Sequence, residues 1–550
     1  MDHLQSRASR DSVLRDAALI LVAVALQGVF LFTMRMTLIR ASRRMEYELR
    51  NDLFAHMVRL PAATYRRTKV GDYLARATND LDAVRNFLGP GLMYLANTIT
   101  TFAMAVTLMC RIDGRLTLIS LLPLPVLSLT VARLGARLHH HYEGIQESFA
   151  TMTAKAQETL AGIRVVKAHV EEEGEFGAFR RIHEDYLERN RAMIRIWASM
   201  GPILSLVGGI SAAVILGFGG AAVVQGRITL GELIAFQIYL AMLIWPMVAL
   251  GWVSNLFQRG AASMARIQAV LSEPGEEDVD LGPRTMSSDG AVDPAGLPSA
   301  DTTIGVRGVG FRYPGSDRSV LKDVNLVLRP GERVALVGRT GSGKTTLLHL
   351  IARLYEPTQG RILFGGVPSG EWPRALLRRR IGFVPQETFL FSDTLRANIG
   401  FGFEDGMAPP DADAVARRAG LASDLAQLPE GLETVVGERG ITLSGGQKQR
   451  VALARALALA RPVLLLDDCF ASVDPGTEEL ILDTLFALPG RPTILLATHR
   501  RSALLRVDRV VVLDGGQVVA AGPHEELIRA GGLYADLYHR EEVAEELEAL

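Results

Sequence analysis

Five long apolar runs without charged residues restrict the fold of this chain more than any other feature of its sequence. The runs extend from Ala17 to Met34, Asn86 to Cys110, Leu116 to Ala132, Ile196 to Gly226 and Leu233 to Gln258. A helix needs about 20 residues to cross the apolar core of a bilayer, and each run is close to that length. A single such run could be a buried helix of a soluble protein. Five of them, with charge confined to the gaps, predict a helical membrane domain.

The gaps between the runs predict the orientation of this domain. Arg111 to Arg115 and Arg227 to Glu232 are short, whereas Arg35 to Arg85 and Arg133 to Arg195 are long and rich in arginine. By the positive-inside rule, the long gaps face the cytoplasm. Their helical, amphipathic patterning predicts that the membrane helices continue well beyond the bilayer surface.

The second half of the chain has a different composition. Pro274 to Thr302 is rich in Pro, Gly, Ser and Asp, which is typical of a linker. From Ile304 onward, short β-branched segments alternate with helical ones, which favours an α/β domain with a largely parallel sheet. We predict a membrane domain over 1–272, a linker over 273–302, an α/β domain over 303–540 and a helical tail over 541–550.

The bulk charge does not suggest a nucleic acid partner. The formal net charge is -1, so the composition gives no reason to expect nucleic acid binding.

The segment from Val334 to Leu350 predicts a phosphate-binding loop. An apolar strand leads into a glycine-rich turn and then into Lys344, Thr345 and a helix-forming sequence. Glycines let the backbone N–H groups turn inward, and the N-terminus of the following helix favours an anion. We expect Lys344 to reach the β- and γ-phosphates of a nucleotide and the Thr345 hydroxyl to bind Mg²⁺. The residues assigned to this loop are Gly338, Arg339, Thr340, Gly341, Ser342, Gly343, Lys344, Thr345 and Thr346.

Two further motifs follow in the α/β domain. Ser444, Gly445, Gly446 and Gln447 stand at the start of a strongly helical sequence and form a second predicted anion site. The run from Val463 to Asp468 predicts a buried strand that ends in two acids, which we expect at the edge of the sheet where such folds bind ligands. We expect Asp467 to hold Mg²⁺ through water.

Together these motifs resemble the ABC transporter superfamily, and their order along the chain is similar to an exporter-type half-transporter. The resemblance implies a membrane all-α helical bundle followed by an α/β P-loop ATPase. It also implies the cofactors ATP and Mg²⁺ and the roles of several single residues. Tyr313 is in the position that stacks on adenine, Gln386 in the glutamine loop that ligates Mg²⁺, and His499 in the switch position. Glu438 matches the exporter-specific loop, and Asp474 matches the loop after the acidic strand.

The resemblance also implies a dimer. In this family two ATPase domains close head to tail, so ATP on Lys344 of one chain meets Ser444 and Gly446 of the other chain. The segments KVGDYLARATNDLDAVR and VVKAHVEEEGEF resemble the two coupling segments of the membrane half.

One departure from the family concerns catalysis. The acid after Asp467 is usually glutamate, and here it is Asp468. Its carboxylate is set back by roughly 1.5 Å, and a misplacement of about 1 Å can cost on the order of 10²-fold in rate. We therefore expect a slow site and favour a heterodimer with a second half-transporter over a homodimer.

The other departure concerns the membrane half, which in this family usually has one span more than the five counted here. Alignment on the coupling segments predicts that the missing span is the first, so that either the chain start is truncated or the partner compensates.

The predicted function is ATP-driven export of amphipathic small molecules, drugs or lipids. The apolar runs carry no internal acid or base that would anchor a charged cargo. The expected location is the bacterial plasma (inner) membrane, crossed several times, with the ATPase domain in the cytoplasm. An ATP-gated regulatory subunit with poor hydrolysis, or an importer built on the exporter architecture, remain alternatives.

Overall fold

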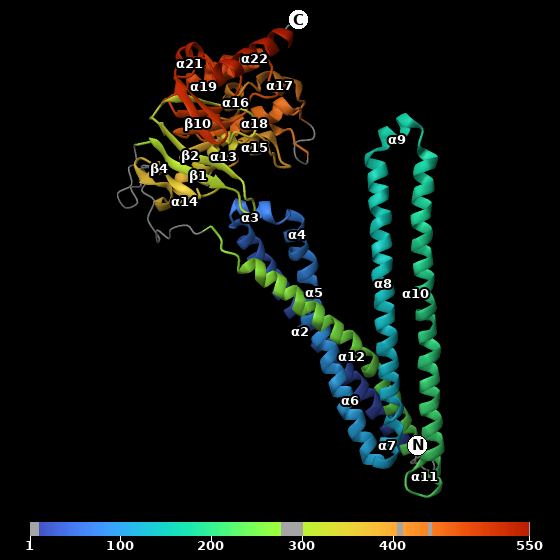
Figure 1. The fold of residues 1–550 in the computed structure, drawn as a ribbon. Helices are drawn as coiled ribbons and strands as arrows, with labels where there is room; N and C mark the ends of the chain where they lie inside the picture. The colour runs from blue at the N-terminus through green and yellow to red at the C-terminus, as the bar shows by residue number, and fades with distance from the viewer. Residues whose placement is uncertain (1–9, 277–300, 404–410, 438–442, 549–550) are drawn as a thin grey trace. The chain divides into compact units, whose positions relative to one another are not determined.

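The computed structural model describes residues 10–276, 301–403, 411–437 and 443–548. The chain forms two compact units (Figure 1). The first contains Met1–Val58 and Gly71–Glu273, and the second contains Arg59–Val70 and Pro274–Leu550. The short segment Arg59–Val70, which the sequence alone places in the membrane part, thus groups with the ATPase part.

The described residues of the first unit form helices and the short turns between them. Its α-helices are α2 (Arg10–Val58), α4 (Val70–Ala75), α5 (Leu81–Asn86), α6 (Leu92–Ile112), α7 (Gly114–Leu121), α8 (Pro123–Ala161), α9 (Ile163–His169), α10 (Glu172–Val214), α11 (Gly220–Val224) and α12 (Leu230–Leu271). Three π-helical turns interrupt this series, η1 (Arg76–Asp80), η2 (Phe87–Gly91) and η3 (Ile215–Gly219).

Local sequence explains where two of these helices start. The Asp113 side chain accepts hydrogen bonds from the first N–H groups of α7, and Thr229 forms a capping box with Glu232 at the start of α12. Both caps lie in the short polar gaps, where the chain reverses between two apolar runs.

Within this unit, α8 and α10 run side by side along their length, and α12 packs along α5 and α6 (Figure 1). Asp80 of η1 accepts hydrogen bonds from the guanidinium of Arg266 of α12 at 2.5 and 2.9 Å, and one from the Ser263 hydroxyl. This paired contact joins α12 to the π-helical turn η1.

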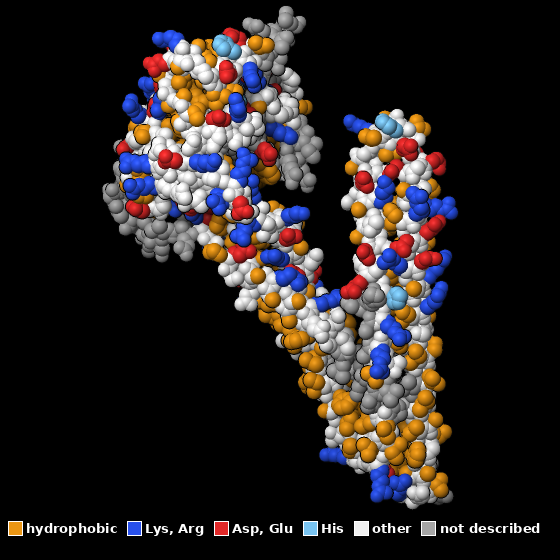
Figure 2. All heavy atoms as spheres, viewed as in Figure 1, with side chains coloured by type: hydrophobic (Ala, Val, Ile, Leu, Met, Phe, Trp, Pro, Cys, Tyr) orange, Lys and Arg blue, Asp and Glu red, His pale blue; other side chains and the backbone are white. Residues whose placement is uncertain are grey.

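The exposed surface of the helical unit is strongly apolar. Among the residues that the structure describes, three helical stretches have the length and apolarity of a membrane crossing, Val13–Val58, Val70–Ile112 and Glu172–Val224. Figure 2 shows hydrophobic side chains gathered on one half of this unit. Charged side chains cover the part of the α8 and α10 pair that lies in the other half. Bare apolar helices of this kind are stable in lipid rather than in water.

All five predicted runs are helical, which confirms a helical membrane domain. The runs 116–132 and 233–258 lie on α7, α8 and α12, and the described part of α12 contains a shorter apolar stretch, Leu230–Leu243. The count of five spans therefore stays a prediction.

The second unit contains two sheets. Its strands are β1 (Ile304–Arg312), β2 (Ser319–Leu328), β3 (Arg333–Val337), β4 (Gln359–Phe364), β5 (Val367–Pro368), β6 (Ile381–Val384), β7 (Val463–Asp467), β8 (Thr493–Ala497), β9 (Arg509–Asp514) and β10 (Gln517–Gly522). The larger sheet has the order β10-β9-β3-β8-β7-β6, with β3, β6, β7, β8 and β9 parallel and β10 antiparallel to β9. The smaller sheet, β2-β1-β4-β5, is antiparallel. The predicted α/β fold with a largely parallel sheet is confirmed.

The α-helices of this unit are α3 (Ala62–Arg67), α13 (Lys344–Ile351), α14 (Arg374–Arg378), α15 (Leu395–Ile399), α16 (Ala412–Arg418), α17 (Ala422–Gln427), α18 (Gly445–Ala458), α19 (Pro475–Phe486), α20 (Arg501–Leu504), α21 (His524–Ala530) and α22 (Leu533–Glu548). Short 3₁₀ turns span Ser369–Glu371 and Gly431–Glu433.

The central strands β3, β7 and β8 are almost completely buried, and their carboxyl ends lie together at one edge of the larger sheet. In an open parallel sheet, ligands bind at this edge. The candidate site is built there.

Candidate functional site

The loop between β3 and α13 is shaped by its three glycines. A Cβ on Gly338 would lie 2.1 Å from the carbonyl oxygen of Leu513, so no other residue fits there. Gly341 and Gly343 have φ angles of +78° and +107°, in the left-handed region that favours glycine. The loop therefore wraps tightly around the N-terminus of α13, as a phosphate-binding loop requires.

Lys344 begins α13 and turns back over the loop. Its Nζ donates hydrogen bonds to the carbonyl oxygens of Gly338 at 2.6 Å and Arg339 at 3.2 Å. Burial lowers the pKa of Lys344, while the nearby carboxylates of Asp467 and Asp468 oppose that shift. The ammonium group is thus placed at the centre of the loop, where phosphate oxygens would lie.

The two acids at the end of β7 differ in their surroundings. Asp467 is 2% exposed, and its Oδ2 atom has no hydrogen-bond partner among the described residues. Burial raises the pKa of Asp467, whereas a hydrogen bond with Thr345 opposes the shift. A buried carboxylate oxygen beside a threonine hydroxyl suits a hard divalent cation.

Asp468 has a φ of +49°, which is unusual for a residue other than glycine. Its N–H donates to the carbonyl oxygen of Ala497 on β8 at 2.9 Å, and this bond fixes the backbone. Strained backbone of this kind is often found at functional sites. The side chain of Asp468 lines the same pocket as that of Asp467.

One pocket of about 250 Å³ brings most of the predicted residues together. The predicted site residues that line it are Thr340, Gly341, Gly343, Lys344, Thr345, Thr346, Gln386, Asp467, Asp468 and His499. Gln386 comes from the loop after β6 and His499 from the loop after β8, so four separate segments converge. Burial and then the positive charge of Lys344 lower the pKa of His499, which favours a neutral imidazole able to accept a hydrogen bond.

Tyr313 lies outside that pocket and lines a neighbouring cavity of about 490 Å³. Its hydroxyl forms a 3.0 Å hydrogen bond with the hydroxyl of Thr346, which lines the pocket. The ring also packs edge-on against Phe311 and Tyr355. The predicted adenine-stacking residue is therefore joined directly to the phosphate-binding loop.

Arg66 of α3 is a site residue that sequence reasoning missed. Its guanidinium lies over the Tyr313 ring, 3.9 Å from the ring centre. The sequence indicates a coupling segment that starts at Lys69, whereas the part that groups with the ATPase unit is Arg59–Val70. The signal available in the sequence is the pair of adjacent arginines, Arg66 and Arg67, just before that segment.

The second predicted anion site has the expected start of a helix, but it does not belong to the pocket around Lys344. Ser444 and Gln447 form a capping box at the start of α18, and a Cβ on Gly446 would lie 2.3 Å from the carbonyl oxygen of Ser472. None of the residues from Ser444 to Gln447 lines the pocket around Lys344. Asp474 caps α19 by accepting a hydrogen bond from the N–H of Thr477. Glu438 lies outside the described residues.

The residues present fit a magnesium nucleotide. The hydroxyl of Ser342 is buried within the loop and has no partner in the described part of the chain, as is the case for Oδ2 of Asp467. These two orphaned polar atoms, with Lys344 and the inward-facing loop backbone, offer one donor set for phosphate and one acceptor for a cation.

Comparison with known families gives two matches on this chain. The model of the ABC transporter transmembrane region matches residues 1–247, and the model of the ABC transporter ATPase, described as "ABC transporter", matches residues 321–471. The two regions correspond to the helical unit and to the unit that holds the pocket.

Several curated proteins are similar over nearly the whole chain. "Probable multidrug resistance ABC transporter ATP-binding/permease protein YheI" of Bacillus subtilis is 36% identical, covering 91% of this chain and 83% of that protein. "Multidrug resistance-like ATP-binding protein MdlA" of Escherichia coli is 36% identical over 96% of this chain and 87% of its own length. "ATP-dependent lipid A-core flippase" of Syntrophus aciditrophicus is 33% identical over 90% and 80%, respectively.

A solved structure is similar in the same way. "Structure of a bacterial Atm1-family ABC exporter with ATP bound" has a TM-score of 0.78 and 28% sequence identity, and it covers 97% of this chain and 93% of its own. The likeness extends through both units.

Proposed function

Because the chain belongs to the ABC transporter family, as an exporter half-transporter with a membrane domain and an ATPase domain, we propose that it moves amphipathic drugs or lipids across the inner membrane. The observation that carries this proposal is the convergence of Lys344, Asp467, Asp468 and His499 on one pocket in a chain that also carries long, exposed apolar helices. Such a chain can use a nucleotide to drive movements of its helices in a bilayer.

A cavity in the helical unit supports the proposed class of cargo. It has a volume of about 800 Å³ and lies among α2, α6 and α12. Its lining combines aliphatic and aromatic side chains with the uncharged polar groups of Gln27, Asn97, Thr100, Thr101 and Tyr239. A lining of this kind suits an uncharged amphipathic molecule, since a buried ion would lack a partner. Names among the relatives, multidrug resistance and lipid A-core flippase, agree with this class.

We assign roles to the ATPase residues that their positions support. Lys344 and the loop N–H groups bind the β- and γ-phosphates, and Asp468 orients the attacking water and accepts its proton. His499, whose pKa is lowered by burial, holds the γ-phosphate region from the carboxyl end of the neighbouring strand β8. When bound by Thr345, Gln386 and Asp467, Mg²⁺ would offset the negative charge of the phosphates.

We assign slow turnover to this chain's own site. Aspartate is one methylene shorter than the glutamate usual in the family, and the Asp468 backbone is fixed by its bond to Ala497, so it cannot move forward freely. Near-attack geometry is sensitive to about 1 Å, which can cost on the order of 10²-fold in rate.

We also assign the chain to a dimer, and we favour a heterodimer. The segment from Ser444 to Gln447 does not line the pocket of its own chain, so it is available to complete a site on a second chain. At the turn between α8 and α10, the apolar side chains of Val165, Val170 and Phe176 are exposed, as expected of a docking surface for a second subunit. A partner with glutamate after its own buried-strand aspartate would supply the fast site.

The slow site makes a second function worth testing, that of an ATP-gated regulatory subunit. Both functions are tested by dye transport in inside-out membrane vesicles, with Hoechst 33342 as the probe. We expect Lys344→Ala to abolish ATP-dependent transport. Loss of transport with Asp468→Asn as well assigns turnover to this site, whereas retained transport with Asp468→Asn assigns gating. ATP-independent dye movement in every variant would reject both functions.

A second measurement, of ATP hydrolysis, tests the heterodimer. Vigorous ATP hydrolysis by the purified chain alone, lost on Asp468→Asn, would overturn the preference for a partner of different sequence.

A further inference from the structure

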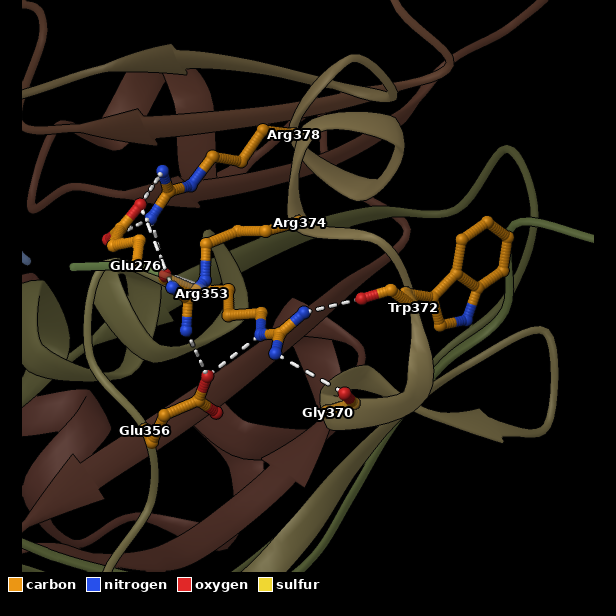
Figure 3. Close-up of polar contacts among 7 residues, drawn as sticks. All are labelled: Glu276, Arg353, Glu356, Gly370, Trp372, Arg374 and Arg378. Atoms are coloured by element: carbon orange, nitrogen blue, oxygen red, sulfur yellow. Dashed lines mark hydrogen bonds and ion pairs between the residues drawn. The ribbon is translucent and has the colours of Figure 1, made fainter. Parts of the chain in front are cut away.

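Glu276, in the segment that follows α12, binds arginine side chains of the ATPase unit through its carboxylate. Glu276 accepts hydrogen bonds from both terminal nitrogens of Arg378, with distances of 2.7 Å and 2.9 Å (Figure 3). The guanidinium of Arg374 lies 3.7 Å from the same carboxylate. A two-pronged contact between arginine and a carboxylate is both strong and directional.

Arg378 carries this contact further into the ATPase unit. Its guanidinium also donates to the carbonyl oxygen of Arg353, just beyond the end of α13. Arg353 is buried and donates in turn to Glu356 and to the carbonyl oxygens of Gly370 and Trp372 (Figure 3). The network thus reaches the turn directly after the helix whose first residue is Lys344.

The position of Arg378 in the sequence adds a second route to the site. Arg374 and Arg378 lie on α14, which leads directly into β6 and from there to Gln386. A shift of Glu276 would therefore reach both the phosphate-binding helix and the predicted magnesium ligand.

The backbone of Glu276 makes one more contact. Its N–H donates to the carbonyl oxygen of Arg59 at 2.7 Å, and Arg59 stands between α2 and α3. Two segments that connect to membrane helices, one after α2 and one after α12, are hydrogen-bonded to each other on the ATPase unit.

We propose that Glu276 is a positioning residue that transmits nucleotide-driven movement of α13 and α14 to the membrane helices. This inference rests on the proposed function of ATP-driven cycling. Loss of the Glu276 charge would leave the guanidinium groups of Arg374 and Arg378 without their shared carboxylate, so α14 would no longer move together with the chain that leaves α12.

The experiment uses the full chain in lipid nanodiscs. It measures two steps separately, the binding of ATP and the movement of the membrane helices. Spin labels are placed on the exposed positions Asn51 of α2 and Thr153 of α8 in a Cys110→Ser background, where the remaining Cys469 is buried. Labelled chain is diluted with unlabelled chain so that only distances within one chain are measured. ATP affinity is measured in parallel with a fluorescent ATP analogue.

We expect MgATP to change the distance between the labels in the unmutated chain. Glu276→Gln should keep ATP affinity within about twofold but lose the distance change. Glu276→Asp, which keeps the charge, should restore part of it. Glu356→Gln is the matched control, because Glu356 belongs to the same network but does not contact Arg378 or Arg59.

Each of the remaining outcomes contradicts a different part of the proposal. A normal distance change in Glu276→Gln, or its loss in Glu356→Gln as well, rejects transmission through Glu276. Loss of ATP affinity in Glu276→Gln assigns the carboxylate a purely structural role. An unmutated chain that binds ATP without any distance change rejects the proposed ATP-driven cycle itself.

Discussion

The guanidinium of Arg66 lies 3.9 Å from the centre of the Tyr313 ring, so a residue between two membrane helices covers the aromatic side chain assigned to adenine. The Tyr313 hydroxyl is at the same time bonded to Thr346 in the phosphate-binding pocket. The ring is therefore fixed by two contacts, one from α3 and one from α13.

The first prediction concerns Arg66. A cation over an aromatic ring at an exposed site contributes about 0.5–1 kcal/mol, so Arg66→Ala should weaken ATP binding by roughly 2- to 5-fold through a less ordered Tyr313. Tripolyphosphate, which has no base to stack, should bind the variant and the unmutated chain equally. Isothermal titration of the full chain with both ligands measures the difference.

Two control variants separate ring stacking from charge. Arg67→Ala removes a neighbouring exposed arginine of the same helix and should leave both affinities unchanged. Arg66→Lys keeps the charge without the planar group, and its affinity for ATP should lie between those of the unmutated chain and Arg66→Ala. Equal weakening toward ATP and tripolyphosphate would show a simple charge effect instead.

The second prediction concerns Asp468. Asp468→Glu moves the carboxylate forward, and we expect kcat for ATP hydrolysis to rise by up to about 10²-fold with little change in KM. Asp468→Asn should remove the remaining activity while ATP still binds. Steady-state phosphate release by the chain, alone and with any purified partner, measures both effects.

An unchanged kcat in Asp468→Glu would contradict the idea that side-chain length limits this site. The backbone at this position, with its φ of +49°, would then be the limiting feature.

The sequence predicts the architecture and the pocket well, because these depend on local patterns. The loop from Gly338 to Thr346 carries its own conformation in its glycines, and β7 delivers Asp467 and Asp468 wherever the sheet forms. Gln386 and His499 could be placed only through the family resemblance, since nothing in their own segments requires them to face Lys344. The structure places both residues in the pocket that Lys344 lines.

Contacts between distant segments could not be predicted in this way. Arg66 and Tyr313, or Glu276 and Arg378, are far apart along the chain, and each is a polar or aromatic residue in an unremarkable sequence context. Only the fold brings α3 and the segment after α12 to the ATPase unit. The separation of Ser444 to Gln447 from the pocket is likewise a matter of tertiary arrangement rather than of local pattern.

The third prediction compares two glycines of one loop. Gly338→Ala places a methyl group against the backbone carbonyl of Leu513, which cannot move aside, and should cost about 3 kcal/mol and abolish ATP binding. Gly341→Ala meets open space and suffers only its positive φ, a cost of about 1 kcal/mol. Thermal unfolding and ATP titration of both variants should therefore rank them clearly, and the opposite order would reject this description of the loop.

The last prediction concerns pH and His349 of α13. Burial, followed by the positive charge of Arg66, lowers the pKa of His349 below its ordinary value of 6.5. The unfolded chain therefore binds more protons than the folded chain below that pH, so the contribution of His349 to stability is complete above pH 6.5 and is lost as the pH falls. His499 and His524 also have lowered pKa values, mainly through burial, and they add to the same trend.

The thermal unfolding midpoint of the ATPase unit in the full chain should consequently decrease as the buffer is taken from neutral to mildly acidic pH. His349→Gln should reduce that decrease, because glutamine at this position has no proton to gain. The exposed His169 of α9, replaced in the same way, serves as the control and should leave the unfolding midpoint of the ATPase unit as it is in the unmutated chain. If His349→Gln and His169→Gln behave alike, the acid sensitivity does not come from His349, and the electrostatic link between α3 and α13 has no measurable effect on stability.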